Sequence, residues 1–389
     1  MNSLELFAGC GGLALGISEA GFKHRLIVEI DSNACSTLTM NKDRQVKHVV
    51  DWPLLQGDVR HIDYSILASS SIDLVSGGPP CQPFSIGGSH KGPRDKRNMW
   101  PEAIRCIREV NPKGFIFENV KGLLRPAFAK YLRYLLLQLS FPDIIKYEGE
   151  MESKYFSRLV NHEKKGGIPT FKVLVHDINT ADYGAAQKRN RALIIGVQTE
   201  FASKFSFPPK THSREALLWS KYKSEEYWKR YNISKGKRTN ISEIDQKLLH
   251  KLEIKGAPSE KPWITVRDTI SDLPSPRLNC KSIANHELHS GARVYAGHTG
   301  SILDEPAKAL KAGAHGVPGG ENILVHENGH VRYFTIREMA RLQGLPDDYY
   351  ICGTWNSSIK QLGNAVPVQI GAFFGKEMFK MINPFSVTD

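Results

Sequence analysis

Short apolar runs alternate with longer amphipathic segments over the first half of the chain. The apolar runs predict strands at residues 3–7, 25–29, 72–76, 114–117, 172–177 and 191–197. The amphipathic segments between them predict helices at residues 12–20, 32–40, 99–110 and 126–139. Strands that alternate with helices are typical of a mostly parallel sheet with helices on its faces. The pattern therefore predicts an α/β domain.

A change of pattern begins at residues 205–209, where Phe-Ser-Phe-Pro-Pro continues neither period. Helix-like stretches at residues 335–342 and 364–381 then restore the first pattern. We infer a smaller domain inserted into one α/β domain. The expected division is 1–200 for the catalytic and cofactor-binding domain, 201–330 for the insertion, and 331–389 for a return segment that completes the first domain.

Composition narrows the class of protein. Of the 389 residues, 41% are hydrophobic and 24% are charged, so the chain can bury a substantial core. The net charge of +12 favours a polyanionic partner, because basic side chains displace counterions from phosphates. The six cysteines are dispersed without a Cys-x-x-Cys pair, which argues against a disulfide framework and a four-cysteine zinc site.

Targeting signals are not evident in the sequence. The first residues enter a predicted strand directly, without the charged and apolar regions of a secretory leader. Apolar runs of the length needed to cross a bilayer are also missing. We therefore expect a soluble, cytoplasmic protein without membrane contact.

The insertion carries half of the net charge. Residues 201–330 contain 20 lysines and arginines against 14 acids, and the densest stretch, 221–238, has seven bases and two acids. Four aromatic residues are interleaved there: Tyr222, Tyr227, Trp228 and Tyr231. Bases mixed with aromatics suit phosphate contact with base stacking, although a solvated helix face has the same composition.

Three glycines follow the first predicted strand, at Gly9, Gly11 and Gly12, where a helix begins. Glycines at such a turn let the backbone approach a ligand and direct helix N–H groups at it. The next strand ends in Glu29, which is placed to accept hydrogen bonds from ribose hydroxyls. Asp58 lies further on and could accept from an adenine amino group. This combination predicts a nucleoside cofactor.

Cys81 lies in the run Ser-Gly-Gly-Pro-Pro-Cys-Gln-Pro-Phe-Ser, directly after a predicted strand. Ligand sites of α/β sheets lie at the carboxyl ends of strands, and a thiolate is a strong nucleophile near neutral pH. A single cysteine is more often a small buried hydrophobe. The paired prolines and glycines around Cys81 favour a nucleophile instead.

These motifs resemble those of the cytosine-5 DNA methyltransferase family, bacterial restriction-modification type, and they occur in the family's order. The matching runs are Phe-Ala-Gly-Cys-Gly-Gly from Phe7, Pro-Pro-Cys-Gln at Cys81, Phe-Glu-Asn-Val from Phe117, Gln-Lys-Arg-Asn-Arg from Gln187, and Gln-Leu-Gly-Asn-Ala-Val-Pro from Gln361. The resemblance implies the Rossmann-like, mostly parallel sheet of S-adenosylmethionine-dependent methyltransferases, with a smaller inserted target-recognition domain.

The chemistry of cytosine explains the residue types. Carbon 5 is a weak nucleophile, so the enzyme must first add Cys81 at carbon 6. Glu118 is expected to hydrogen-bond or protonate ring nitrogen 3, which is general acid assistance. By resemblance, Arg191 contacts the base and Arg189 supports it. The target base must leave the stack to be reached. The base that removes the carbon 5 proton is not identified, and a water could act.

The resemblance also implies the cofactor and the remaining site residues. S-adenosylmethionine is expected to contact Phe7, Gly9, Gly11, Gly12, Leu13, Glu29, Ile30, Asp58, Val59, Pro79, Asn364 and Val366. Double-stranded DNA is expected to contact Gln82, Ser85, Lys91, Arg94, Arg97, Gln187, Arg230 and Arg238. We expect residues 82–97 to close over the flipped base. No protein partner is evident, although the enzyme type implies a companion restriction endonuclease that need not bind it.

Several alternatives stay open on sequence alone. A transfer RNA could replace DNA as substrate, as in one branch of the family. A nicotinamide dehydrogenase could use the glycine turn and leave Cys81 structural, or the chain could be a catalytically silent DNA-binding relative. His286 and His289, with Cys280 upstream, have imperfect zinc spacing and no evident fourth ligand, so we expect no metal. Asn119 is expected to orient the catalytic loop, contact the base's surroundings or form a turn.

Overall fold

A computed structural model describes the chain except for residues 68–69, 81–97, 279–281, 295–298, 314–321 and 384–389. The chain divides into two compact units, each formed from separate segments. Unit 1 comprises Met1–Ile178, Asn190–Pro208 and Gly371–Asp389, and unit 2 comprises Asn179–Arg189 and Pro209–Ile370. The functional division predicted above, at 200 and 330, stays a prediction.

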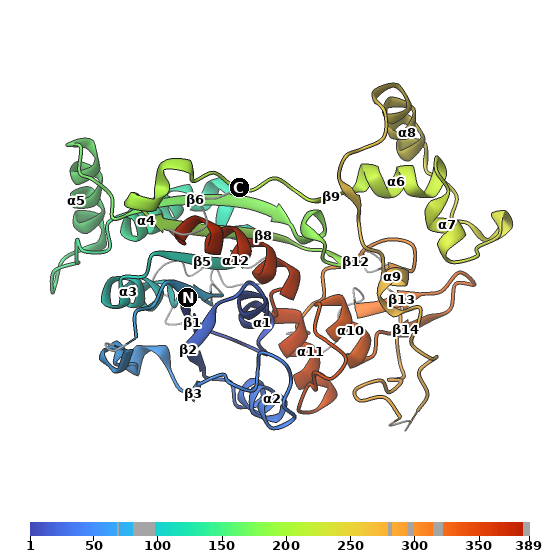
Figure 1. Ribbon diagram of the computed structural model, residues 1–389, viewed down its shortest axis with the longest axis horizontal. Coiled ribbons are helices and arrows are strands. Elements are labelled where there is room, and N and C mark those ends of the chain that lie inside the picture. Colours follow the sequence, from blue (N-terminus) through green and yellow to red (C-terminus); the bar gives the residue numbers. More distant parts are fainter. Residues whose placement is uncertain (68–69, 81–97, 279–281, 295–298, 314–321, 384–389) are drawn as a thin grey trace. The chain divides into compact units, whose positions relative to one another are not determined.

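Unit 1 is built on a seven-stranded sheet (Figure 1). Its strands, in spatial order, are β3 (Leu54–Gln56), β2 (Lys23–Glu29), β1 (Asn2–Leu6), β4 (Leu74–Gly77), β5 (Gly114–Val120), β8 (Asn190–Gln198) and β6 (Phe171–Asn179). The ladders from β3 to β5 are parallel, and β8 pairs antiparallel with β5. The predicted α/β class with a mostly parallel sheet is confirmed.

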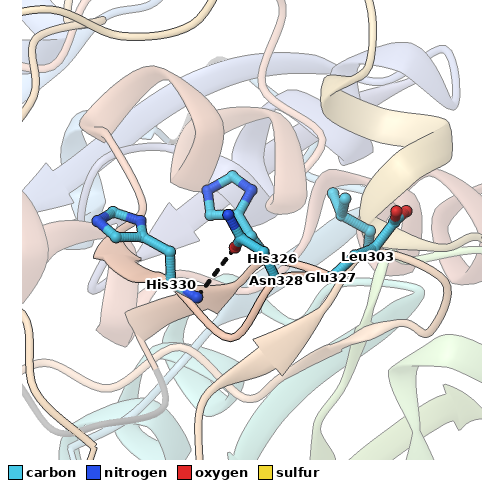
Figure 2. Close-up of a pocket in the computed structure, with 5 residues that line it drawn as sticks. All are labelled: Leu303, His326, Glu327, Asn328 and His330. Atoms are coloured by element: carbon cyan, nitrogen blue, oxygen red, sulfur yellow. Dashed lines mark hydrogen bonds between the residues drawn. The ribbon is translucent and has the colours of Figure 1, made fainter.

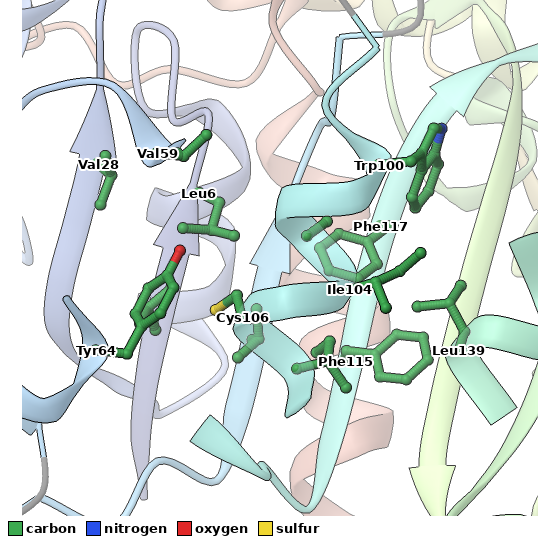
Figure 3. Close-up of a cluster of buried hydrophobic side chains, with 14 of the residues drawn as sticks. Leu6, Val28, Val59, Tyr64, Trp100, Ile104, Cys106, Phe115, Phe117 and Leu139 are labelled. Atoms are coloured by element: carbon green, nitrogen blue, oxygen red, sulfur yellow. The ribbon is translucent and has the colours of Figure 1, made fainter. Parts of the chain in front are cut away.

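One face of this sheet packs on helices α3 (Trp100–Val110) and α4 (Ala129–Ser140). Figure 3 shows apolar side chains of both layers meeting there, including Leu6, Phe117 and Trp100. The Trp100 and Phe117 rings meet edge to face with centroids 5.6 Å apart, a favourable aromatic geometry. Burial of this apolar cluster stabilises unit 1.

The opposite face of the sheet carries α1 (Gly12–Glu19) and α12 (Val368–Ile382), which lie against each other. A Cβ atom added to Gly371 would lie 2.7 Å from the carbonyl oxygen of Leu13, and one added to Gly375 would lie 2.9 Å from Cβ of Ala20. Glycine therefore allows the two helices to approach closely. The last helix of the chain thus completes the layer that begins with the first one.

The last helix begins later than its periodicity predicts. Asn364 is the final residue of α11 (Trp355–Asn364), and α12 starts only at Val368. Pro367 accounts for the break, because the residue before a proline avoids helical geometry and proline favours a helix start. Two elements of the structure, strand β3 and helix α5 (Glu152–Lys164), are not predicted from the sequence pattern.

Unit 2 combines short helices with very short strands. Its helices are α6 (Arg214–Tyr222), α7 (Glu226–Arg230), α8 (Glu243–Lys255), α9 (Val266–Ile270), α10 (Ile336–Leu342) and α11. Its strands are β7 (Gln187–Lys188) paired with β12 (Ala307–Lys308), β9 (His212–Ser213) paired with β10 (Lys261–Pro262), and the set β11 (Ser301–Ile302), β13 (Ile323–Val325) and β14 (Val331–Tyr333).

The aromatic residues of the basic stretch form a small core. Tyr227 and Trp228 are each 1% exposed, and Tyr222 and Tyr231 pack partly buried beside them. The Tyr227 hydroxyl donates to Asp304 over 2.9 Å. Base stacking, one of the two interpretations of this stretch, is excluded for Tyr227 and Trp228 by their burial in this core.

Helix α10 lies within the helix-like stretch predicted at residues 335–342. Thr335 accepts a hydrogen bond from the N–H of Glu338, and the Glu338 carboxylate accepts one from the N–H of Thr335. This reciprocal pair is a capping box. Arg337 is fully buried and donates to the backbone carbonyls of Ala284, Pro346 and Tyr349, so its contacts are structural. Among the helices that the structure describes, none is long and apolar enough to cross a membrane.

Candidate active site

Glu118 and Arg191 face each other at the ends of two antiparallel strands. In the register of β5 and β8, Glu118 is opposite Leu193. Arg191 is opposite Val120, so the two charged side chains lie diagonally on one face. Nε of Arg191 is 2.6 Å from Oε1 of Glu118, with side chains only 17% and 11% exposed. The guanidinium therefore fixes the carboxylate in a largely water-shielded place.

The segment before Cys81 runs beside this pair. A Cβ atom added to Gly78 would be 3.8 Å from Oε2 of Glu118, so the backbone passes close to the carboxyl group. Buried Asn119, next to Glu118, donates from Nδ2 to the carbonyl of Pro79 over 2.9 Å. This bond agrees with one of the three roles considered for Asn119, that of orienting the loop, and its role stays a prediction. Glu118 and the backbone that leads to Cys81 are therefore held together.

Cys81 itself lies outside the described residues. The same holds for the predicted DNA contacts Gln82, Ser85, Lys91, Arg94 and Arg97, and for the expected closure of residues 82–97. These assignments stay predictions. The residues on either side of this gap that the structure describes are Pro80 and Asn98. Nδ2 of Asn98 donates a hydrogen bond to the hydroxyl of Tyr131 over 3.0 Å.

The loop after β1 has the backbone conformation of a ligand cradle. Phe7, Gly9 and Gly11 all have positive φ angles, of 58°, 55° and 86°. Gly11 is the N-cap of α1, so the free N–H groups of Gly12 and Leu13 begin that helix. A Cβ atom at Gly9 would meet nothing within 4 Å, which leaves open space above the loop.

Glu29 connects this loop to the end of β2. Its carboxylate accepts hydrogen bonds from the N–H of Gly9 over 2.7 Å, of Ile30 over 2.8 Å and of Asp31 over 2.7 Å. Glu29 therefore shapes the cofactor loop before it binds any ligand. No local sequence pattern predicts this contact, because it joins positions 20 residues apart.

Two further predicted cofactor contacts lie beside Glu29. The strand register pairs Glu29 with Gln56, and the N–H of Gly57 donates to the Glu29 carbonyl over 2.8 Å, which brings Asp58 to the same edge. Asp58 pairs with Arg60, and that hydrogen bond lowers the pKa of its carboxyl to about 2. Ile30 is 63% exposed, so its apolar side chain is accessible beside Glu29. Val59 lies mostly buried in the core beneath.

Gln187 and Arg189 belong to unit 2 and are buried there. The Gln187 side chain donates to Gln343 over 2.8 Å and to the carbonyl of Leu342 over 3.2 Å. Arg189 donates to the carbonyls of Leu310 and Gly363 over 3.0 and 2.9 Å. The predicted DNA contact of Gln187 would require this network to open, and the predicted supporting role of Arg189 would act through it. Both roles stay predictions.

Other predicted site residues of unit 2 differ in accessibility. Asn364 is exposed at the end of α11, whereas Val366 is buried. Arg230 has a side chain that is 55% exposed and pairs with Asp268 over 2.9 Å. Arg238 is only 18% exposed and is held by Glu225 over 3.0 Å. Of the two arginines, Arg230 has the more exposed side chain, and the DNA contacts predicted for both stay predictions.

A shallow hollow lies at the turn between β13 and β14, lined by Leu303, His326, Glu327, Asn328 and His330. Figure 2 shows both imidazole rings on one side of this turn, with Asn328 between them in the chain. The turn is closed by a bond from the N–H of His330 to Oδ1 of Asn328 over 3.0 Å. Arg267 anchors Glu327 over 2.7 Å. Imidazole and amide groups here could hydrogen-bond a polar partner.

The histidines considered for zinc have other partners. His286 makes hydrogen bonds to Thr335 and to the carbonyl of Pro274, and His289 stacks on Trp355 with centroids 3.8 Å apart. Cys280 is outside the described residues. Within the described part of the chain, no group of three or more potential metal ligands is present.

Comparison with known sequences gives related methyltransferases along nearly the whole chain. The sequence pattern of the family described as C-5 cytosine-specific DNA methylase matches residues 1–380. The type II methyltransferase M.NgoMIV of Neisseria gonorrhoeae is 29% identical over 391 residues, which cover 98% of this chain and 98% of that protein. The type II methyltransferase M.PspPI of Psychrobacter sp. is 30% identical over 388 residues, which cover 98% of this chain and 79% of that protein.

Solved structures show the same fold. The S. pombe Dnmt2 methyltransferase superposes with a TM-score of 0.56 at 16% identity, covering 98% of this chain and 99% of that one. The Entamoeba histolytica methyltransferase EhMeth gives a TM-score of 0.56 at 14% identity with the same coverage. At such low identity the likeness concerns the arrangement of the elements alone.

Proposed function

This chain belongs to the C-5 cytosine-specific DNA methylase family and is a DNA (cytosine-5)-methyltransferase, and from that premise we propose a role for each group of its active site. The observation that carries the proposal is that the Glu118–Arg191 pair lies beside the backbone of Gly78, three residues before Cys81. Cys81 is the nucleophile, Glu118 acts on the ring, and Arg191 holds Glu118 and contacts the base.

The roles follow from where charge moves during the reaction. The Cys81 thiolate forms a bond to carbon 6 of the flipped cytosine, and the electron pair of the ring moves toward nitrogen 3, where Glu118 supplies a hydrogen bond or proton. Carbon 5 then acts as an enamine carbon and takes the methyl group. A base, for which a water could serve, then accepts the carbon 5 proton; the bond from carbon 6 to sulfur breaks, the Cys81 thiolate leaves and the ring is restored. The 2.6 Å contact with Arg191 holds the Glu118 carboxyl in position to act on ring nitrogen 3.

The cofactor proposed for this reaction is S-adenosylmethionine, which supplies an activated methyl group when bound. The described residues fit it: Gly9 leaves open space, and Gly12 and Leu13 offer the N–H groups at the start of α1 to a carboxylate. Glu29 offers carboxylate oxygens to ribose hydroxyls, and exposed Ile30 offers an apolar surface to a purine. Phe7, Gly11, Asp58, Val59, Pro79, Asn364 and Val366 complete the proposed set.

The proposed macromolecular substrate is double-stranded DNA, read by unit 2, in a restriction-modification system. The supporting observations are the excess of basic residues over residues 201–330 and the exposed guanidinium of Arg230. The turn that carries His326 and His330 is our candidate for contact with base edges or phosphates. His330→Ala, compared on cognate and non-cognate duplexes in binding assays, should reduce their discrimination; unchanged discrimination would remove the turn from the recognition surface.

The chemical roles can be tested with duplex DNA and labelled S-adenosylmethionine. Cys81→Ser should abolish methylation, and Glu118→Gln should lower kcat by about 10²–10⁴-fold because the acid is lost. Duplexes with 5-fluorocytosine should trap a covalent complex with wild-type enzyme and none with Cys81→Ser, since fluorine cannot leave as a proton. Equal methylation by Cys81→Ser would overturn the mechanism.

The substrate can be tested in the same assay. Transfer RNA should be methylated far more slowly than duplex DNA, and the reverse preference would contradict the proposed substrate. Bisulfite sequencing of DNA from cells that express the protein should show methylation at one recurring sequence.

A further inference from the structure

Glu5 is a buried acid that the mechanism above does not use. It lies in the middle of β1 with an exposure of 1%, and its Oε2 accepts a hydrogen bond from the hydroxyl of Ser76, which is fully buried on β4. Burial raises the pKa of Glu5 to about 8, and the Ser76 hydrogen bond opposes that shift. A carboxyl group in such a place costs stability, so its presence calls for a reason.

The strands joined by this bond lead to the two halves of the active site. In the parallel ladder of β1 and β4, Glu5 is the register partner of Ser76, and Leu6 is the partner of Gly77. One residue after Leu6 the cofactor loop begins at Phe7. Beyond Gly77 the chain runs through residues 78–80 to Cys81.

Two successive register positions are locked in different ways. Glu5 and Ser76 are joined through their side chains. At the next position Gly77 lies so close to β1 that a Cβ atom would be 2.4 Å from the carbonyl oxygen of Leu6. The side-chain bond and the close backbone approach together resist sliding or separation of the strand ends.

A neighbouring polar pair on the same face of β1 makes a different connection. Ser3 bonds to Nδ1 of His24 on β2 over 3.0 Å, and Nε2 of His24 bonds to the carbonyl of Ala14 over 2.9 Å. Both Ser3 and His24 are buried, but neither touches β4 through these bonds. The connection to the strand that bears the catalytic segment is thus made by Glu5.

We propose that Glu5 is a positioning residue for methyl transfer, whose hydrogen bond to Ser76 sets the separation between the cofactor loop and the catalytic segment. This inference rests on the proposed function of Cys81 and the cofactor loop. A displacement of about 1 Å between reacting groups can cost about 100-fold in rate. Glu5 therefore acts on the rate through the backbone of both loops, without touching substrate.

The test compares Glu5→Leu, Glu5→Gln and Ser76→Ala in the full-length enzyme. Glu5→Leu and Ser76→Ala should lower kcat by about 10- to 100-fold at saturating cofactor and DNA, because the loops lose their spacing. Glu5→Gln should keep most of the activity, since its amide oxygen still accepts from Ser76. The dissociation constant for DNA should stay unchanged in all three variants.

Ser3→Ala is the matched control, because it removes a buried hydrogen bond on the same face of β1 without affecting β4. It should lower the melting temperature and leave kcat unchanged. Equal kcat losses in Ser3→Ala and Ser76→Ala would show a merely structural role for Glu5, and wild-type kcat in Glu5→Leu would overturn the proposal. Trapping on 5-fluorocytosine DNA reports Cys81 separately, so failure of the proposed mechanism is distinguishable from failure of this inference.

Discussion

At the scale of single residues, two buried acids of unit 1 have opposite surroundings. Glu118 faces a permanently charged guanidinium 2.6 Å away, whereas Glu5 faces a neutral hydroxyl. The first arrangement holds a carboxyl group at a reaction site, and the second holds one inside a core. Their different partners lead to separate predictions, one on activity and one on stability.

Arg191→Lys should lower kcat/KM by about 10²-fold, because an ammonium cannot reproduce the planar, multidentate contacts of guanidinium. Methyl incorporation at varied DNA concentration measures the effect. Arg133→Lys is the control, since Arg133 pairs with Glu163 at the surface with a side chain 49% exposed. Similar kinetics in both variants would exclude a special role for the Arg191 guanidinium.

Glu5 should make wild-type stability fall as pH rises. Its pKa is about 8 in the folded state against an ordinary value of 4.5. Between these two pH values the folded state keeps a proton that the unfolded state has lost, so the free energy of unfolding falls as pH rises. The range from pH 6.5 to 8 isolates the effect, because the pKa of buried His24 is lowered to about 4 by desolvation and its contribution changes only below 6.5.

Relative to Glu5→Gln, the wild type should lose about 2 kcal/mol of unfolding free energy from pH 6.5 to 8. Urea denaturation at several pH values measures it. Parallel stability curves for the two proteins would show that Glu5 titrates normally.

The sequence identifies Glu118 and Arg191 as candidate site residues but does not predict their contact, and it does not single out Glu5. Glu118 and Cys81 are recognisable because each follows an apolar strand in a distinctive run. The contact of Glu118 with Arg191 depends on the antiparallel register of β5 and β8, which no local pattern encodes. The bond from Glu5 to Ser76 likewise depends on the pairing of strands that are distant in the chain.

At the scale of elements, Gly77 at the end of β4 and Gly9 in the loop after β1 are required for different reasons. Gly77 is required by a close backbone neighbour, whereas Gly9 faces open space and is required by its positive φ. The elements therefore predict different outcomes for the same substitution.

Gly77→Ala should destabilise the fold by about 1–3 kcal/mol, because a methyl group would collide with the Leu6 carbonyl. Gly9→Ala should cost less stability but weaken cofactor binding by straining the loop. Urea denaturation and calorimetric titration with S-adenosylmethionine separate the two effects. The reverse assignment of stability loss and affinity loss would contradict this account.

Elements with a clear period were predictable, whereas those set by tertiary contacts were not. Helix α10 lies within the stretch predicted at residues 335–342, and its capped start follows from local chemistry. For the aromatic residues of the basic stretch the sequence leaves base stacking and a solvated helix face open, because a small buried core uses the same residue types. Burial of Tyr227 and Trp228 depends on Leu217 and more distant neighbours such as Trp263.

At the scale of the whole molecule, the net charge of +12 predicts salt-sensitive binding to DNA. Arg230→Gln should reduce the slope of log Kd against log salt by about 0.9, the value for one phosphate contact. Fluorescence anisotropy between 50 and 200 mM salt, about the range over which such effects are large, measures the slope. Arg133→Gln on unit 1 should leave it unchanged, and the opposite result would place the DNA contact elsewhere.

The inserted domain is a prediction from the change in sequence pattern, because residues in the predicted insertion follow neither the strand nor the helix period. Which residues join each compact unit could not, since that depends on contacts such as those of Arg189 with Leu310 and Gly363. These contacts join positions more than a hundred residues apart, and no sequence pattern near Arg189 predicts them.

The packing of α12 on α1 sets an order of events during synthesis on the ribosome. The face of α1 around Gly16 and Ile17 is made early, but the glycines that cover it, Gly371 and Gly375, are translated nearly last. Until then the helix behind the cofactor loop lacks its neighbour. A nascent chain, or one truncated before Gly371, should therefore be unable to hold the cofactor, so modification of DNA begins only when translation is nearly complete.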